Sequence, residues 1–287
     1  MLAFILLLII LASSNCVRAF PVNQRYLPMG LLSMLVSQSV KHEGARNKAA
    51  QELMDSEIGW VDPRILGGRL LDASGLCFFT TADEGEPLNL IISGNSDPYV
   101  LSEAGFSDYI KSLGFSTECL GVHIGNIHQA DLGDGNGRHD EQVLARQYYF
   151  MGPLAYLWYL LGKSGWYSCS IFWSDFSFFS QSVPCYVGGN HFRAWKQDGH
   201  EAASGAWFLG ASKEENSRKN HKIIPNGYNI GRDFLVAQAV SSPTHWNSMW
   251  WQAELDWVEG LLEPGSEGVN HGIEQDGLVA VLTVSRL

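Results

Sequence analysis

The chain has 287 residues, of which 46% are hydrophobic, and a formal net charge of −11 at pH 7. A chain of this length can bury a large core in one domain or in two small ones. Its 19 Lys and Arg residues form no basic tract to offset 30 Asp and Glu residues. This balance argues against general binding to nucleic acid or to anionic membranes, although a local basic pocket stays compatible with it.

The first 19 residues have the features of a cleavable secretory signal peptide. The segment 1–12 is almost entirely apolar, 13–15 is polar, and Val17 and Ala19 place small residues at −3 and −1 of the expected cleavage site. Cleavage leaves 268 of the 287 residues and removes Arg18, which moves the formal charge from −11 to −12. We therefore expect a secreted, extracellular protein. The alternative is an uncleaved N-terminal membrane anchor, because the start of the chain is uncharged and Arg18 occupies −2.

Cysteine usage agrees with an oxidising compartment. Cys16 leaves with the signal peptide, so an even number of cysteines remains: Cys77, Cys119, Cys169 and Cys185. We expect one or two disulfides and favour Cys169–Cys185 with Cys77–Cys119, although the sequence leaves all three pairings open. The spacing contains no CxxC pair, which argues against a zinc site built on these thiols.

The first half of the chain mixes helical and strand patterns. The clearest strand is 87–93, which is aliphatic and ends before Gly94. Asp97 or Ser102 can cap the following helix, which we expect to end near Leu113. Weaker patterns predict a helix near 45–54, short strands within 59–81 and a strand over 120–127.

The second half continues this mixture without a strict alternation of strand and helix. Segments 191–196 and 205–212 are predicted to be paired strands with a polar loop between them. One segment, 249–262, carries apolar residues at helical spacing: Trp251, Leu255, Val258 and Leu262. We also expect helices from about His139 and over 231–239, and a final strand over 278–284. The whole pattern favours an α+β fold with a mixed, mainly antiparallel sheet and flanking helices.

The segment 148–186 is rich in aromatic residues and has only Lys163 and Asp175 as charges. Pro153 and Gly162 interrupt it before about 18 clean apolar residues accumulate, which argues against a membrane span in the mature chain. A buried hairpin or helix is the simpler interpretation. A third interpretation is that the segment is absent from the native protein, as a retained intron would be.

The strongest candidate for chemistry lies in the sequence Asn190-His191-Phe192-Arg193-Ala194. On a strand, His191 and Arg193 share one face, while Phe192 and Ala194 share the other. Further along, His221 and the pair Arg232-Asp233 supply a second imidazole and a second guanidinium. Two His and two Arg side chains can form a pocket for an anion such as phosphate or carboxylate. The alternative is that each is a satisfied core or surface residue.

These blocks resemble the LssY C-terminal domain family, through Asn190 to Trp195, Gly205 to Ser212, and His221 to Val236. The segment from Pro87 to Phe115 is similar to that family's opening strand and helix. The resemblance implies no activity, since the domain is functionally uncharacterised; in bacteria it often accompanies membrane-embedded lipid-phosphatase or DedA-like regions, which this chain lacks. Gly231 departs from the pattern, which has an acidic residue before Arg-Asp, and 148–186 has no counterpart.

The resemblance and the patterns together suggest four parts. They are a signal peptide (1–19), an N-terminal extension packed on the core (20–85), an LssY C-terminal-like domain with the aromatic insertion (86–243), and a C-terminal helix and strand (244–287).

A glycine-rich acidic loop offers oxygen ligands that suit calcium: Asp131, Asp134, Asn136 and Asp140. The EF-hand register fails there, because position 1 falls on Leu132 and position 12 on Val143. We therefore predict a plain turn and no metal. His123 and His128 lie five residues apart, which on a regular strand sends them to opposite faces and makes them poor joint ligands.

Three functions stay open from the sequence. The first is a secreted protein that binds a small anionic or lipid-derived ligand through Asn190, Arg193, Arg232 and Asp233 with the two histidines. The second is a hydrolase of phosphoester-like bonds, with His191 or His221 as general acid/base. The third is a non-enzymatic extracellular interaction protein. No cofactor is identified.

Overall fold

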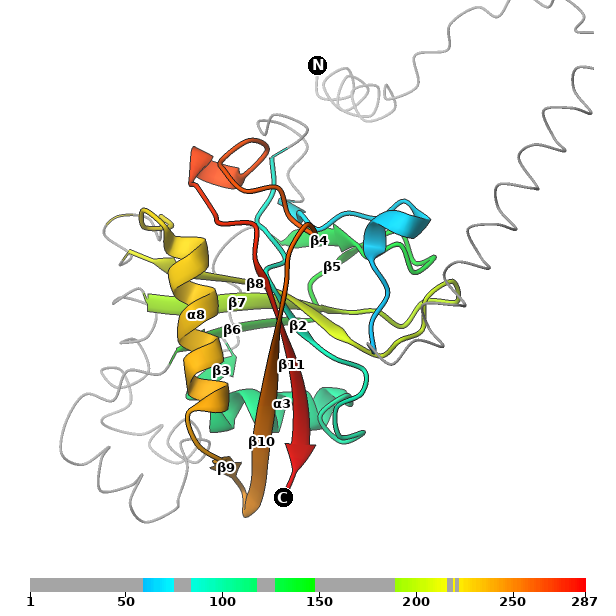
Figure 1. Ribbon diagram of the computed structural model, residues 1–287, viewed down its shortest axis with the longest axis vertical. Coiled ribbons are helices and arrows are strands. Elements are labelled where there is room, and N and C mark those ends of the chain that lie inside the picture. The colour runs from blue at the N-terminus through cyan, green and yellow to red at the C-terminus, as the bar shows by residue number, and fades with distance from the viewer. Residues whose placement is uncertain (1–58, 75–83, 118–126, 148–188, 216–218, 220–221) are drawn as a thin grey trace, which may run out of the picture. The chain divides into compact units, whose positions relative to one another are not determined.

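The computed structural model describes residues 59–74, 84–117, 127–147, 189–215, 219 and 222–287, all within one compact unit, Ala45–Leu287. Its main element is an eight-stranded sheet in the order β3-β6-β7-β8-β2-β11-β10-β9 (Figure 1). The strands are β2 (Leu90–Ile92), β3 (Phe115–Thr117), β6 (Val143–Gln147), β7 (Gly189–Lys196), β8 (Trp207–Glu214), β9 (Thr244–Trp246), β10 (Met249–Val258) and β11 (Val279–Arg286). A second sheet, in the order β1-β4-β5, consists of β1 (Ala73–Ser74), β4 (His128–Asp131) and β5 (Arg138–Asp140).

The pairing within the large sheet is antiparallel except between β2 and β11. This confirms the prediction of a mixed, mainly antiparallel sheet, and β7 pairs with β8 as expected. The described residues contain two α-helices, α3 (Glu103–Ser112) and α8 (Gly227–Val240), and two short 3₁₀ helices, η1 (Pro63–Leu66) and η4 (Asn270–Gly272). Because strands dominate, the α+β class itself stays a prediction.

Both α-helices cover one face of the large sheet and share its core. Helix α3 begins where the sequence predicts it: the Ser102 hydroxyl accepts a hydrogen bond from the Gly105 N–H at 3.1 Å. Gly114 follows its end with a left-handed φ of 81°, which glycine adopts without strain. On this face Phe106 of α3 stacks on Trp207 of β8 with ring centroids 4.3 Å apart.

Helix α8 approaches the backbone of β8 very closely at Gly231. A Cβ atom at this position would lie 2.3 to 2.6 Å from backbone atoms of Ser212. No side chain fits there, which gives a packing reason for glycine at the position where the resembled family has an acidic residue.

The opposite face of the sheet packs against the small sheet and the loops around it. Its apolar cluster includes Leu70, Ala130, Trp195 and Phe208, all nearly or fully buried. Toward β6, β7 and β8 the same face becomes polar, and this transition positions the candidate site.

Two helix predictions are wrong. The segment from Met249 forms strand β10, which pairs with β11 along eight residues, and Trp251 and Ala253 are buried while Trp250 and Glu254 are exposed. This alternation has a period of two, and an aromatic-rich segment suits a strand that is buried on one face. The helix expected from His139 is also absent, because Arg138–Asp140 forms β5.

Several predictions fall outside the described residues. They concern the signal peptide, the helix near 45–54, most of the strand over 120–127, the aromatic segment 148–186, His123, His221 and all the cysteines. Within the described ranges, no helix is both long enough and apolar enough to cross a membrane.

Candidate functional site

A group of buried polar side chains lies where the small sheet meets the polar face of the large one. Asp72 immediately precedes β1, Glu86 lies on the segment leading into β2, and His128 is the first residue of β4. Their exposed fractions are 0%, 6% and 6%. Backbone pairing holds the first two side by side, since the Asp72 N–H donates to the Glu86 carbonyl at 2.9 Å. We call Asp72, Glu86 and His128 the acidic triad.

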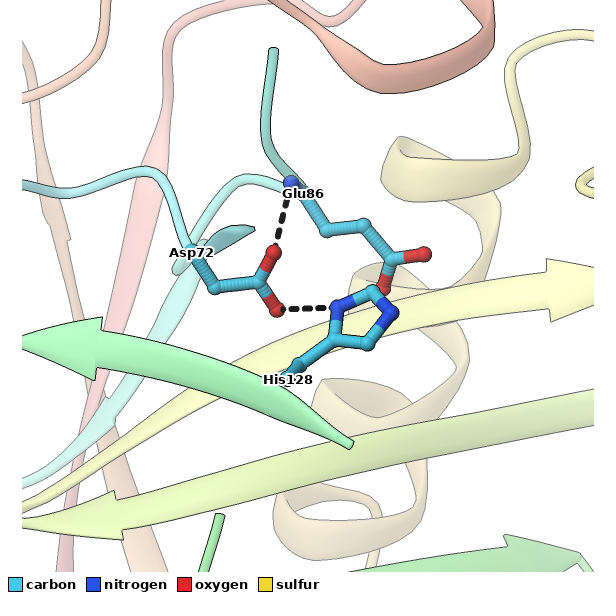
Figure 2. A group of neighbouring side chains, drawn as sticks. All are labelled: Asp72, Glu86 and His128. Carbon is cyan, nitrogen blue, oxygen red and sulfur yellow. Dashed lines mark hydrogen bonds and ion pairs between the residues drawn. The ribbon is translucent and has the colours of Figure 1, made fainter. Parts of the chain in front are cut away.

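The carboxylate of Asp72 is the centre of the acidic triad (Figure 2). Its Oδ1 accepts a hydrogen bond from the Glu86 backbone N–H at 2.9 Å, and its Oδ2 lies 3.0 Å from Nδ1 of His128. Each of the three side chains offers one ligand atom, and these atoms all lie within 4.8 Å of one another. Figure 2 shows the Glu86 side chain folded back toward the His128 ring.

Glu86 is the least satisfied member of the triad. Its Oε2 atom is buried and has no hydrogen-bond partner in the described structure. Burial raises the pKa of this carboxyl to about 7, and the charge of Asp72 adds to the rise, while His128 and Arg193 act against it. A partnerless buried carboxylate is costly, so this position favours either a proton or a cation.

The acidic neighbours of His128 favour the charged form of its imidazole. Burial acts to lower its pKa, but the hydrogen bond and charge of Asp72, together with the charge of Glu86, outweigh burial and raise the pKa. Glu141 also braces this residue, because its Oε2 accepts a hydrogen bond from the His128 backbone N–H at 2.5 Å.

The predicted strand residues lie next to this triad. As the alternation predicts, Phe192 and Ala194 enter the helix-covered core, whereas Arg193 faces the polar side and pairs with Glu141 at 2.5 Å. The charge of Arg193 acts on both Glu86 and His128, so the three lie within electrostatic range of one another. The Nε atom of Arg193 is buried without a partner in the described structure.

His191 belongs to a second, adjoining network. Its Nδ1 lies 3.0 Å from the Ser212 hydroxyl, and its Nε2 lies 3.4 Å from Oε1 of Glu214, which also pairs with Arg146. Burial lowers the pKa of His191 to about 3; Glu214 opposes this shift, and Arg146 adds to it. The imidazole is therefore neutral at physiological pH.

The other predicted ligand residues are not brought to this site. Arg232 on α8 makes paired hydrogen bonds to Asp276 at 2.6 and 2.8 Å, contacts Asp233 at 2.7 Å, and lies 4.9 Å from the ring centroid of Trp257. Asn190 donates to Gln147 at 2.7 Å. Arg193 and Arg232 thus each pair with carboxylates, and nothing in the described structure joins Arg232 to His191.

The glycine-rich acidic loop forms local turns. Asp134 is fully buried, and its carboxylate accepts hydrogen bonds from the N–H groups of Asn136 and Gly199 at 3.0 Å each. Asp131 accepts from the Gly133 N–H at 3.0 Å, and Asp140 accepts from the Gln129 amide at 2.8 Å. These carboxylates have protein donors, which fits the turn better than calcium.

An open cleft with a volume of about 590 Å³ lies on the described surface, and one of its residues, His271, is within electrostatic range of His128. It is lined by Lys222, Ile223, Pro225, Asn226, His271, Gly272, Ile273 and Glu274, none of which belongs to the acidic triad. The triad is therefore a buried group of polar side chains and does not form the floor of this cleft. Its burial favours a very small ligand.

The comparisons with known proteins add no assignment. No protein-family model matches the chain, and neither a curated protein nor a solved structure is significantly similar to it. The resemblance to the LssY C-terminal domain family stays a prediction.

No sequence pattern singles out Asp72 or Glu86, and the spacing of His128 from His123 argued against a metal-binding role. The only local signal was an acidic residue within an apolar context, Leu71-Asp72-Ala73, and a Glu directly before the clearest strand. The contact that joins them depends on pairing between residues 56 positions apart, which no local pattern records.

Proposed function

We propose that this protein binds a small cation among the buried polar side chains at and around the acidic triad, rather than the anion that the sequence favoured. The observation that carries this proposal is the partnerless, buried Oε2 atom of Glu86 beside a second carboxylate, that of Asp72. The surrounding charge supports it. The buried polar side chains at and around the triad include more carboxylates than guanidiniums: Asp72, Glu86, Glu141 and Glu214 against Arg146 and Arg193.

The anion-binding hypothesis has less support. An anion at Arg193 or Arg232 would meet the repulsion of a carboxylate already paired with that guanidinium, namely Glu141 or Asp276. A buried guanidinium that is already paired offers little net attraction to a second anion.

The hydrolase alternative has one specific observation in its favour. Ser212, His191 and Glu214 follow one another as hydroxyl, imidazole and carboxylate, an order that serves nucleophilic catalysis in other proteins. Against this, Ser212 is fully buried and the pKa of His191 is about 3, which makes it a weak base. A hydrolase that works this way would lose its ester-cleaving activity in Ser212→Ala.

We also propose that the protein is exported, on the strength of the apolar first 12 residues and the small residues Val17 and Ala19. Extracellular fluid contains divalent cations, so an exported binding site of this kind has ligands available to it.

Thermal unfolding of the full chain tests cation against anion binding. Protein treated with chelator and dialysed would be mixed with chlorides of Ca²⁺, Mn²⁺, Zn²⁺ and methylammonium, or with sodium phosphate, sulfate and citrate. A cation at 100 times its Kd stabilises by about 2.7 kcal/mol, or roughly 5 °C or more in a chain of this size. At least one cation should raise the Tm and the anions should not. A Tm raised by anions alone would overturn the proposal.

A further inference from the structure

The acidic triad has the composition of a metal site. We propose that the cation bound there is a single divalent transition-metal ion, of the Zn²⁺ or Mn²⁺ type, coordinated by Asp72, Glu86 and His128. This inference rests on the proposed cation-binding function and specifies the ion and its ligands.

The separation of the ligand atoms suits one shared ion. Oδ2 of Asp72 and Nδ1 of His128 lie 3.0 Å apart, and all three ligand atoms lie within 4.8 Å of one another. Two ligands each about 2.1 Å from an ion, and at right angles around it, are about 3.0 Å apart. An ion can thus take the place of the hydrogen that now joins Asp72 to His128, and a small rotation of the Glu86 side chain completes the set.

Glu86 provides an independent reason to expect a ligand. Its side chain lies within the triad, the residue is 6% exposed, and its buried Oε2 atom has no hydrogen-bond donor among the described residues. Buried polar atoms in folded proteins are nearly always paired, so an unpaired carboxylate oxygen beside a second carboxylate favours the binding of a cation.

The mixture of ligand types selects the class of metal. Calcium and magnesium prefer sites made only of oxygen ligands, whereas an imidazole nitrogen with two carboxylates suits zinc, manganese and related ions. Two carboxylates from Asp72 and Glu86 also match the charge of one divalent ion. The remaining oxygen of Asp72 already accepts from the Glu86 N–H at 2.9 Å, which holds this carboxylate in place.

The ligands come from three separate segments of the chain. Asp72 precedes β1, Glu86 precedes β2 in the large sheet, and His128 begins β4. An ion shared by them would tie the small sheet to the large one, so binding should stabilise the fold as well as fill the site.

The test is a calorimetric titration of the metal-stripped full chain with Zn²⁺, Mn²⁺, Ca²⁺ and Mg²⁺. The metal content of the protein is then measured after dialysis. Three variants remove one ligand each with little change of shape: Asp72→Asn, Glu86→Gln and His128→Gln. Two controls leave the triad intact: Asp276→Asn, which changes a carboxylate that pairs with Arg232, and His200→Gln, which removes an exposed imidazole.

We expect one equivalent of Zn²⁺ or Mn²⁺ to bind, with Ca²⁺ and Mg²⁺ at least tenfold weaker. Glu86→Gln and His128→Gln should each weaken binding by about 100-fold or more, a larger loss than changes to residues around the ligands cause. Asp276→Asn and His200→Gln should stay within about threefold of wild type. Co²⁺ added to the wild-type protein should give visible absorption bands that His128→Gln lacks, and circular dichroism would show whether each variant is folded.

Two different failures are distinguishable. If methylammonium raises the Tm and no transition metal binds, the metal assignment is wrong and cation binding survives. If no cation binds at all, both proposals are wrong. Tight binding of Zn²⁺ or Mn²⁺ that is unchanged in folded Glu86→Gln and His128→Gln would place the metal elsewhere and overturn the inference.

Discussion

The Asp72 carboxylate and the His128 imidazole meet at 3.0 Å although 56 residues separate them in the chain. Their meeting places a second carboxyl, that of Glu86, against both groups in a buried position. Because of this contact, three residues with no distinctive sequence motif form the best-supported candidate site of the described structure.

Replacing Glu86 with Gln should stabilise the metal-free protein at alkaline pH. Burial raises the pKa of Glu86 to about 7 from an ordinary value of 4.5, so its stabilising contribution is present below about pH 4.5 and is lost as the pH rises through 7. The amide has no such loss. Urea unfolding of metal-stripped protein should therefore show a gain for Glu86→Gln at pH 8, at most about 3 kcal/mol, and little gain at pH 4.5.

The same substitution should weaken metal binding by about 100-fold or more, so it separates the effect on binding from the effect on stability. A variant that is more stable than wild type without metal, yet is not stabilised by Zn²⁺ or Mn²⁺, would exclude unfolding as the reason for lost binding. Equal pH profiles for the two proteins would show that Glu86 does not titrate as described.

Replacing His191 with Gln should remove part of the acid sensitivity of the fold. Burial lowers the pKa of His191 to about 3 from 6.5, so the stability it contributes is present above about pH 6.5 and is lost as the pH falls toward 3. Wild type should lose up to about 1.4 kcal/mol per pH unit in this window relative to His191→Gln. Urea unfolding at pH 4, 5, 6 and 7 measures the difference, and a constant difference across these values would contradict the assignment.

Gly231→Ala should destabilise the protein strongly. The added methyl group would lie 2.3 to 2.6 Å from the Ser212 backbone, so helix α8 would have to move away from β8. We expect a loss of about 2 kcal/mol or more in the free energy of unfolding. Gly260→Ala serves as the control. A Cβ atom at Gly260 meets nothing within 4 Å, so this variant is subject only to the strain of a left-handed φ of 76°. A loss at Gly231 no larger than at Gly260 would argue against the close approach.

Arg232→Lys should reduce stability without affecting metal binding. Lysine cannot reproduce the paired hydrogen bonds to Asp276 or the stacking on Trp257. We expect a loss of about 1–2 kcal/mol, which is moderate because Asp276 and Asp233 are partly exposed to solvent. Zn²⁺ or Mn²⁺ affinity should match wild type. A large fall in affinity would mean that Arg232 reaches the site, as the anion-pocket hypothesis required.

Export should leave a mature protein that begins at Phe20. N-terminal sequencing of material from the culture medium tests this, and retention of residues 1–19 on a membrane-bound form would favour the uncleaved anchor instead. Mass spectrometry of the same material for a peptide from 151–184 would also show whether the aromatic segment is part of the native chain.

Sequence patterns predicted those features of strands and helices that depend on residues close together in the chain. Ser102 and Gly114 delimit α3 because capping and left-handed backbone are properties of single residues, and β7 alternates as its side chains require. The strand β10 was missed because Trp251, Leu255 and Val258 also fit a helical spacing, and only pairing with β11 decides between the two.

The candidate site could not be predicted from such patterns, because it too depends on pairing between distant segments of the chain. His191 and Arg193 stood out because they are close in sequence, yet both have acidic partners, Glu214 and Glu141, from other strands or loops. The acidic triad is assembled by backbone pairing across segments that share no motif, so its members look ordinary until the sheets come together.

The most direct test of the account is anomalous diffraction from crystals grown with one equivalent of Zn²⁺ or Mn²⁺. We expect one strong anomalous peak between the carboxylates of Asp72 and Glu86 and the ring of His128, at about 2.0–2.3 Å from each ligand atom. A triad with no peak, or a peak only at surface residues, in crystals that contain the metal would contradict it.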